Sequence, residues 1–391
     1  MIFGAGNIGR GFMGQLFHEA GYRLIFVEYR RELVEMLNSA GKYPLRLLDA
    51  YSGEELDLLI DDLEATAAEE TGRIAEFFAT ADVAGTAVGV NNLQAITPLV
   101  VAGIRRRMAR GEGPVDIYLC ENMYGAGDKL KAYVFEQLTT GERQWAEEHI
   151  GFVGTSVARM VPAPDKRFAG EGPLFVVADA YHKWPYDKAA RRAPAPAIEG
   201  MEGVNIEAEF ARKLHTHNLG HAAMGYLGYL KGYTYVDETF RDDTLLEIFR
   251  GALDETAGAL AKRYPDDIRE EEHREIIRDV IVRFGNHMLK DPLTRVVGDP
   301  IRKLGHNERI VGSIRLCMDY GIETGYIEKV AGAAYCYDHP ADPRAVQLQE
   351  MISGQGIAAV IREVSGLDPA VAPGKGILEN YHDFCRKKEM R

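Results

Sequence analysis

Near its start the chain reads Phe3-Gly4-Ala5-Gly6-Asn7-Ile8-Gly9-Arg10-Gly11-Phe12, and residues 4–9 fit the pattern G-x-G-x-x-G. A lone match of this kind is weak, because glycine turns are common. Here the turn follows an apolar run and precedes a segment with helical spacing of its apolar residues. A second apolar run then ends at Glu28, 19 residues after Gly9. These four features together are typical of a dinucleotide-binding turn and argue against a purely structural one.

Each glycine of the turn has its own physical role in this interpretation. Gly4 permits the tight turn, Gly6 lets the backbone approach a pyrophosphate, and Gly9 permits close packing of helix against strand. The helix N-terminus presents free N–H groups to the anion. Glu28 accepts hydrogen bonds from ribose hydroxyls and repels a 2′-phosphate, which favours NAD over NADP. Only three residues precede Gly4, so the first strand is unusually short or the start is truncated.

The first half of the chain alternates strand-like and helix-like segments. Strands are expected at 22–28, 83–88 and 115–120, and helices at 9–20, 30–40 and 93–110. Residues 44–80 are less regular and predict an antiparallel excursion and a short helix. Strands that alternate with helices imply right-handed crossovers and a parallel sheet. The fold class is therefore α/β, with an N-terminal Rossmann-type doubly wound sheet.

A Pro/Ala-rich stretch at residues 193–197 ends the alternation, and helical spacing dominates beyond about residue 205. We place the domain boundary near residue 200, with a dinucleotide-binding domain at 1–200 and a mostly helical domain at 201–391. Helices are expected in the second domain at 207–230, 243–263, 269–288, 307–320, 322–335, 342–353 and 355–364.

Charge and cysteine content narrow the class of protein. The 391 residues include 46 Lys and Arg against 59 Asp and Glu, a net charge of −13. So acidic a chain is a poor candidate for binding nucleic acid or an anionic membrane. Four widely spaced cysteines fit neither a disulfide framework nor a zinc knuckle, and indicate reduced thiols in a cytoplasmic protein. They are Cys120, Cys317, Cys336 and Cys385.

Two further segments follow predicted strands, where ligands bind in open α/β sheets. They read Gly85-Thr86-Ala87-Val88-Gly89 and Cys120-Glu121-Asn122-Met123. Each alone is typical of an ordinary turn, and they gain weight beside the glycine turn. The predicted cofactor-binding residues for NAD(H) are Gly4, Gly6, Asn7, Ile8, Gly9, Arg10, Glu28, Thr86, Val88, Gly89, Glu121 and Asn122.

A helix early in the second half carries an unusual polar stripe. At about 100° per residue, and with Lys213 set at zero, His217 falls near 40°, His221 near 80° and Asn218 near 140°. The stripe has three interpretations: a solvated face, a metal site, or a catalytic group with Lys213 as general acid/base. The i, i+4 histidines lack the Glu and the third ligand of a zinc site. A lysine needs a lowered pKa to act as a base near neutrality.

The motif Lys213-x4-Asn218-x2-His221 resembles the catalytic signature of the polyol-specific long-chain dehydrogenase/reductase, or mannitol dehydrogenase, family. The resemblance runs from Phe3 to about Leu367. It is also carried by the glycine turn, the two segments after strands, Arg283-Phe284-Gly285-Asn286 and Arg302-Lys303-Leu304.

The resemblance implies metal-independent hydride transfer between a ketose and its polyol. Lys213 would be the acid/base, Asn218 and Asn122 would bind the reacting oxygen, and His221 would hold substrate and lysine in register. Arg295 and Lys303 match two basic substrate-binding positions, and Arg302, beside Lys303, is predicted to bind substrate with them. The family includes monomers, so a monomer is compatible with it. His215 and His217 receive no role, and Ala158 replaces an Asp that many relatives carry near the substrate.

Residues 283–303 hold five basic and two acidic side chains in a chain of net charge −13. This is either an ordinary basic helix face or a socket for an anionic substrate, where Arg offers paired donors. We therefore rank fructose 6-phosphate/mannitol 1-phosphate first, reduction of a hexuronate (fructuronate or tagaturonate) second and free mannitol/fructose third. The alternative from a different class is a non-catalytic NAD-binding sensor.

Overall fold

The computed structural model describes residues 1–164, 166–168 and 170–389. Its contacts divide the chain into two compact units, Met1–Glu209 and Phe210–Arg391. Each unit is described by itself.

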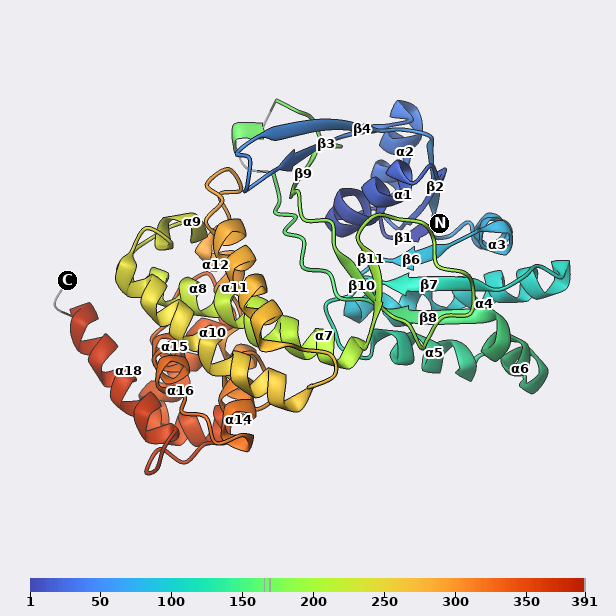
Figure 1. Cartoon of the computed structure of the whole chain (residues 1–391). Coiled ribbons are helices and arrows are strands. Elements are labelled where there is room, and N and C mark those ends of the chain that lie inside the picture. The colour runs from blue at the N-terminus through green and yellow to red at the C-terminus, as the bar shows by residue number, and fades with distance from the viewer. Residues whose placement is uncertain (165, 169, 390–391) are drawn as a thin grey trace. The chain divides into compact units, whose positions relative to one another are not determined.

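The first unit is built on a six-stranded parallel sheet in the order β5-β2-β1-β6-β7-β8 (Figure 1). This confirms the predicted α/β, Rossmann-type class. β2 and β6 pair with β1 on its two sides, so the strand order reverses at β1. In open α/β sheets, ligands bind at such a reversal. The strands are β1 (Ile2–Phe3), β2 (Leu24–Glu28), β5 (Leu63–Ala67), β6 (Ala84–Thr86), β7 (Val115–Leu119) and β8 (Ile150–Gly154).

Two hydrophobic clusters cover the two faces of this sheet. Alternate residues of a strand point to opposite faces, and Ile2 belongs to one cluster while Phe3 belongs to the other. All five residues of β7 are buried, as expected for a strand covered on both sides. The helices of this unit are α1 (Gln15–Glu19), α2 (Arg31–Ala40), α3 (Thr71–Thr80), α4 (Leu93–Arg110), α5 (Ala126–Glu136) and α6 (Thr140–His149).

The helix after the glycine turn starts with a π-helical segment, Gly9–Gly14, before α1. Tyr43 lies against this widened turn, and its hydroxyl donates to Arg10 O at 2.8 Å. A Cβ on Gly14 would lie 2.4 Å from the Tyr43 hydroxyl. The predicted helix at 9–20 is therefore present, but its first turns are wider than an α-helix.

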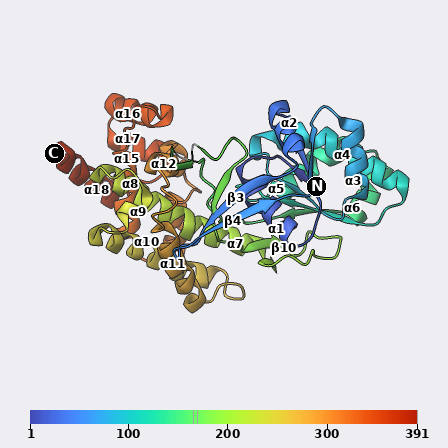
Figure 2. The same cartoon turned by 90° about the horizontal axis from the view of Figure 1, so that it is seen from above.

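The irregular segment 44–80 forms the expected antiparallel excursion and short helix. The excursion is the hairpin of β3 (Tyr43–Leu48) and β4 (Glu55–Ile60), and β9 (Val176–Asp179) pairs with β3 in parallel. Figure 2 shows β3 and β4 side by side. The prediction missed β5, which returns to the main sheet as its edge strand. A separate pair, β10 (Trp184–Asp187) and β11 (Met201–Val204), is also parallel.

In its described part, the second unit is helical. All seven predicted helical regions are present; α10 has the predicted bounds, and the other six differ from the prediction at one or both ends. The short helices α9, α12 and α13 and the last helix, α18, were not predicted. The elements are α7 (Ile206–Lys213), a π-helical segment (Leu214–Asn218), α8 (Leu219–Lys231), α9 (Val236–Thr239), α10 (Asp243–Arg263), α11 (Glu270–Phe284), α12 (Leu293–Val297), α13 (Pro300–Lys303), α14 (Val311–Asp319), α15 (Gly325–Tyr335), α16 (Pro343–Gln355), α17 (Ile357–Val360), a second π-helical segment (Ile361–Ser365) and α18 (Gly374–Glu389).

Glycine lets the helices of this unit pack closely. A Cβ on Gly332 of α15 would lie 2.7 Å from the Cβ of Asn380 on α18. A Cβ on Gly225 of α8 would lie 2.4 Å from a methyl of Val297 on α12. Among the described residues, no helix is long and apolar enough to span a bilayer.

Candidate functional site

The glycine turn of the first unit joins β1 to the following helix at very short range. Gly4 has φ +96°, and its N–H donates to Val27 O at 2.8 Å. A Cβ on Gly4 would lie 2.6 Å from Ala87 O, and a Cβ on Gly9 would lie 1.9 Å from Gly4 O. Gly6 differs, because nothing lies within 4 Å of the position of its Cβ. Gly4 and Gly9 are therefore required by the fold itself, whereas Gly6 leaves open space over the turn.

Glu28 fastens this turn to the end of β2. Its side chain is 2% exposed, and its two oxygens accept from Ala5 N at 3.0 Å, from Tyr29 N and Arg30 N at 3.1 Å each, and from the Arg30 guanidinium. Burial acts to raise the pKa of Glu28, but the hydrogen bonds from Arg30 and Ala5 outweigh it, so the pKa is lowered. The carboxylate is therefore ionised and fixed, and a ribose would share it with Arg30.

Glu121 has an equivalent role behind β6. Its carboxylate accepts from Thr86 Oγ1 at 2.6 Å and from Val88 N at 3.1 Å. Burial raises its pKa. These contacts hold residues 86–89, where Gly89 has φ +83°, beside the glycine turn. Asn122 follows at the surface, exposed after the end of β7.

The side chains of two other predicted cofactor-binding residues, Arg10 and Asn7, form hydrogen bonds with backbone carbonyls of the protein. Arg10 is 7% exposed, and its guanidinium donates to Ala5 O at 2.8 Å and Leu174 O at 2.6 Å. Asn7 Nδ2 donates to Val161 O at 3.2 Å. These contacts brace the turn against Val161 and Leu174, and cofactor binding by the two side chains stays a prediction.

The observed cradle fits a dinucleotide. A turn without side-chain bulk at Gly6, a helix that starts directly behind it, and a buried ionised carboxylate at the end of β2 are the groups that a pyrophosphate and a ribose require.

In the second unit the helix that carries Lys213 is not regular. Lys213 ends α7, the next five residues form a π-helical segment, and Leu219 begins α8. A π-helix turns by less than 100° per residue, so the predicted angles of His217 and Asn218 from Lys213 are wrong. Insertions of this kind are frequent at functional sites, because they redirect side chains without breaking the helix.

His217 and His221 lie together beside Phe284. Their ring centroids are 4.7 Å apart, and His221 stacks on Phe284 at 3.8 Å with an interplanar angle of 4°. His221 Nε2 and His217 Nδ1 are buried, and no hydrogen-bond partner for them is found among the described residues. Burial and neighbouring positive charges lower both pKa values well below the usual range, so both rings are neutral at pH 7.

His215 is held apart from these two histidines. Its Nδ1 lies 2.8 Å from Ser313 Oγ, and Ser313 Oγ donates to Arg309 O at 2.5 Å. Burial lowers the pKa of His215 to about 4. This ring therefore ties the π-helical segment to α14.

In the described part of the chain, no group of three or more His, Cys, Asp or Glu side chains is placed to hold a metal ion.

The basic residues predicted to bind substrate have protein partners. Arg295 is paired with Asp291 through two hydrogen bonds, and Arg302 with Asp299 and Glu308 at 3.0 Å each. Lys303 is 4% exposed, and its ammonium donates to Val296 O at 2.8 Å and to Gly298 O. Burial, with Arg309 and Arg302, lowers the pKa of Lys303 to about 7. Substrate binding by these residues stays a prediction.

Comparison with known proteins identifies the family. Residues 1–200 match the family model described as the mannitol dehydrogenase Rossmann domain, and residues 205–381 match that of the mannitol dehydrogenase C-terminal domain. The chain belongs to the mannitol dehydrogenase family. Membership in this family makes it an NAD-dependent oxidoreductase, and confirms the resemblance noted in the sequence.

Curated relatives match this family member over nearly its whole length. A mannitol-1-phosphate 5-dehydrogenase of Brevibacillus brevis is 36% identical over 372 residues, which cover 95% of this chain and 94% of the relative. A mannitol-1-phosphate 5-dehydrogenase of Bacillus licheniformis is 36% identical over 367 residues, 94% of this chain and 95% of the relative.

Solved structures share the fold of this family member at lower identity. A ternary complex of Pseudomonas fluorescens mannitol 2-dehydrogenase with NAD and D-mannitol has a TM-score of 0.77 at 18% identity, covering 99% of this chain and 92% of that one. A substrate-free D-sorbitol dehydrogenase has a TM-score of 0.81 at 16% identity, covering 99% and 93%.

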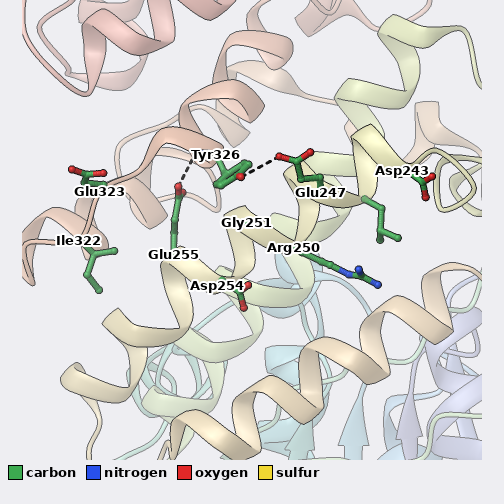
Figure 3. Close-up of a pocket in the computed structure, with 10 residues that line it drawn as sticks. Asp243, Glu247, Arg250, Gly251, Asp254, Glu255, Ile322, Glu323 and Tyr326 are labelled. Carbon is green, nitrogen blue, oxygen red and sulfur yellow. Dashed lines mark hydrogen bonds between the residues drawn. The ribbon is translucent and has the colours of Figure 1, made fainter.

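A pocket of about 690 Å³ lies elsewhere on the second unit, between α10 and α15. None of the predicted site residues is among those found to line it. Glu255 of α10 points at the start of α15 (Figure 3), where its oxygens accept from Tyr326 N at 2.8 Å and Ile327 N at 3.0 Å. Burial raises the pKa of Glu255 to about 7; Glu328 adds to the rise, and the two N–H groups and Lys329 oppose it.

The glycine turn predicts opposite outcomes for two alanine substitutions. Gly6→Ala should leave the melting temperature unchanged and weaken NADH binding by tenfold or more, because only a bound pyrophosphate would meet the new methyl. Gly9→Ala should lower the melting temperature, because its methyl would overlap Gly4 O. Gly72→Ala, on the open surface of α3, is the control. Thermal unfolding and NADH fluorescence titration measure both effects, and unchanged NADH affinity in Gly6→Ala would contradict the assignment.

Glu255 predicts a pH-dependent difference in stability. The pKa of Glu255 is higher in the folded protein than in the unfolded chain. The contribution of Glu255 to the free energy of unfolding is therefore fully present below about pH 4.5 and is lost as the pH rises through about 7. Glu255→Gln does not titrate. Relative to wild type, the variant should therefore gain about 1–2 kcal/mol in free energy of unfolding between pH 5 and pH 8, after allowance for solvent screening. Urea titrations at both pH values measure this, and a constant difference would refute it.

Proposed function

We propose that this enzyme transfers a hydride, without a metal, between fructose 6-phosphate and mannitol 1-phosphate. The observation that carries the proposal is the full-length similarity to relatives named mannitol-1-phosphate 5-dehydrogenase. The chemistry of the second unit supports it, because Lys213, Asn218 and His221 lie on one π-bulged helix, and the charges of Arg283, Arg295, Lys303 and Arg309 act on His221.

The roles proposed for these residues are those that the family resemblance implies, and the chemical groups of the residues suit them. Lys213 would give a proton to the ketose oxygen in reduction and take the hydroxyl proton in oxidation. The amide N–H groups of Asn218 and Asn122 would donate to that oxygen and stabilise its developing negative charge. His221 is neutral, so its ring can both donate and accept, and it would hold substrate and lysine in register. When bound, the nicotinamide supplies or accepts the hydride.

A substrate panel tests the proposal. NADH oxidation is measured with fructose 6-phosphate, fructose, fructuronate and tagaturonate, before and after exhaustive chelation. We expect the highest kcat/KM with fructose 6-phosphate and no effect of the chelator. Preference for a uronate would assign the enzyme to hexuronate reduction, and preference for fructose to mannitol 2-dehydrogenation. NADH binding without turnover of any of the four would indicate a sensor.

Lys213→Ala should lower kcat by about 10²–10⁴-fold, the usual contribution of a positioned acid/base group. NADH affinity should stay within twofold of wild type, because the cofactor cradle belongs to the first unit. Lys42→Ala, which removes an exposed lysine, is the matched control. A Lys213→Ala variant with wild-type kcat would remove this residue from the mechanism.

Glu28 should set the preference for NADH over NADPH. In the dinucleotide-binding pattern this acid faces the ribose, so its fixed negative charge would repel a 2′-phosphate, and we expect kcat/KM to be at least tenfold higher with NADH. Glu28→Gln, which keeps the acceptor oxygen for Ala5 N, should reduce this ratio. An unchanged ratio would show that another group sets the preference.

A further inference from the structure

Arg309 is a buried cation of the second unit, and within the described part of the chain its terminal nitrogens make no hydrogen bond. It lies just before α14 and is 9% exposed. Its Nε donates to Glu308 Oε2 at 3.2 Å, but among the described residues no hydrogen bond is found from either terminal nitrogen. Neither terminal nitrogen is among the fully buried polar atoms that have no hydrogen-bond partner, so both are accessible to solvent. A guanidinium buried to this degree with two open donors is suited to an anion.

The neighbouring cations differ from Arg309 in this respect. Arg295 is held by Asp291, Arg302 by Asp299 and Glu308, and Lys303 by two backbone carbonyls. Glu308 also orients Arg309, because one of its oxygens binds Arg302 and the other binds Arg309. The carboxylate thus fixes one edge of the Arg309 guanidinium and leaves the far edge open.

Arg309 is also joined to the helix of Lys213. Its carbonyl accepts from Ser313 Oγ, which in turn contacts His215 of the π-helical segment. The Arg309 charge is near enough to depress the pKa of both His217 and His221. His221 Nε2 is buried without a partner. The open guanidinium edge and an orphan ring nitrogen therefore occur in one region of the second unit.

We propose that Arg309 binds the phosphate of the sugar substrate through its two terminal nitrogens and is the residue that selects phosphorylated over neutral sugars. The inference rests on the proposed function, whose ketose carries a phosphate monoester. A phosphate is nearly dianionic at pH 7 and presents three acceptor oxygens, so it can bind both nitrogens of the guanidinium at once.

The test compares fructose 6-phosphate with fructose in wild type, Arg309→Gln and Arg309→Lys. We expect Arg309→Gln to lower kcat/KM for fructose 6-phosphate by about 100-fold, mainly through KM, and to change that for fructose by less than threefold. Arg309→Lys keeps the charge but loses the paired donors, so its loss should be intermediate. Arg344→Gln, an exposed arginine on α16, is the matched control. Melting temperature and NADH affinity verify folding, and Arg309→Lys keeps the test decisive if Arg309→Gln does not fold.

Equal losses on both substrates, or no loss, would overturn the role of Arg309. If wild type does not reduce fructose 6-phosphate, the proposed function fails, and competition by inorganic phosphate against the substrate that is used tests the subsite separately. Phosphate inhibition in wild type that disappears in Arg309→Gln would support the subsite, and absence of inhibition in wild type would overturn it. Selective loss of uronate reduction in Arg309→Gln would overturn the assignment to phosphate.

Discussion

The contact of Gly9 with Gly4 O is the constraint on which the first unit depends. It brings the helix directly onto the end of β1, where the sheet order reverses. A side chain at Gly9 would separate the helix from the strand, and one at Gly4 would meet Ala87 O in the segment after β6, so either would disturb the open cradle over Gly6. Glu28 then binds Ala5 N from the neighbouring strand. The glycine turn therefore depends both on the strand order and on Glu28. The candidate binding surface is a consequence of how the backbone packs.

Acids that are buried (Glu28, Glu121) or half-buried (Glu255) organise both units in a similar way. Glu28, Glu121 and Glu255 each accept backbone N–H groups at the point where one element meets another. A buried carboxylate costs free energy unless it is hydrogen-bonded or paired, and these three are hydrogen-bonded to the main chain. The ion pairs of the second unit follow the same rule, since each of Arg295 and Arg302 has a carboxylate partner. The chain thus uses part of its acidic excess to fix backbone and cations in place.

Much of the fold could be predicted from sequence, because periodicity and glycine punctuation are local signals. They predicted α4 and α10 with their observed bounds, and β2, β6 and β7 to within two residues. The edge strand β5 and the short helices α12 and α13 were missed, because four or five residues carry too little periodicity and gain their structure from packing. The wrong helical angles around His217 have another cause, since a π-helical insertion leaves no mark in the apolar pattern.

The sequence by itself determined the family, the α/β class, the glycine turn and the candidate residues, because these depend on residue type and spacing along one chain. Tertiary structure alone decided which charges are already paired. The sequence does not distinguish the five basic residues of 283–303 by their partners. In the folded chain Asp291 pairs with Arg295, Asp299 and Glu308 pair with Arg302, and backbone carbonyls accept from Lys303. Arg309 lies outside that segment and has open donors. Pairing depends on distances between side chains that only the folded chain brings together.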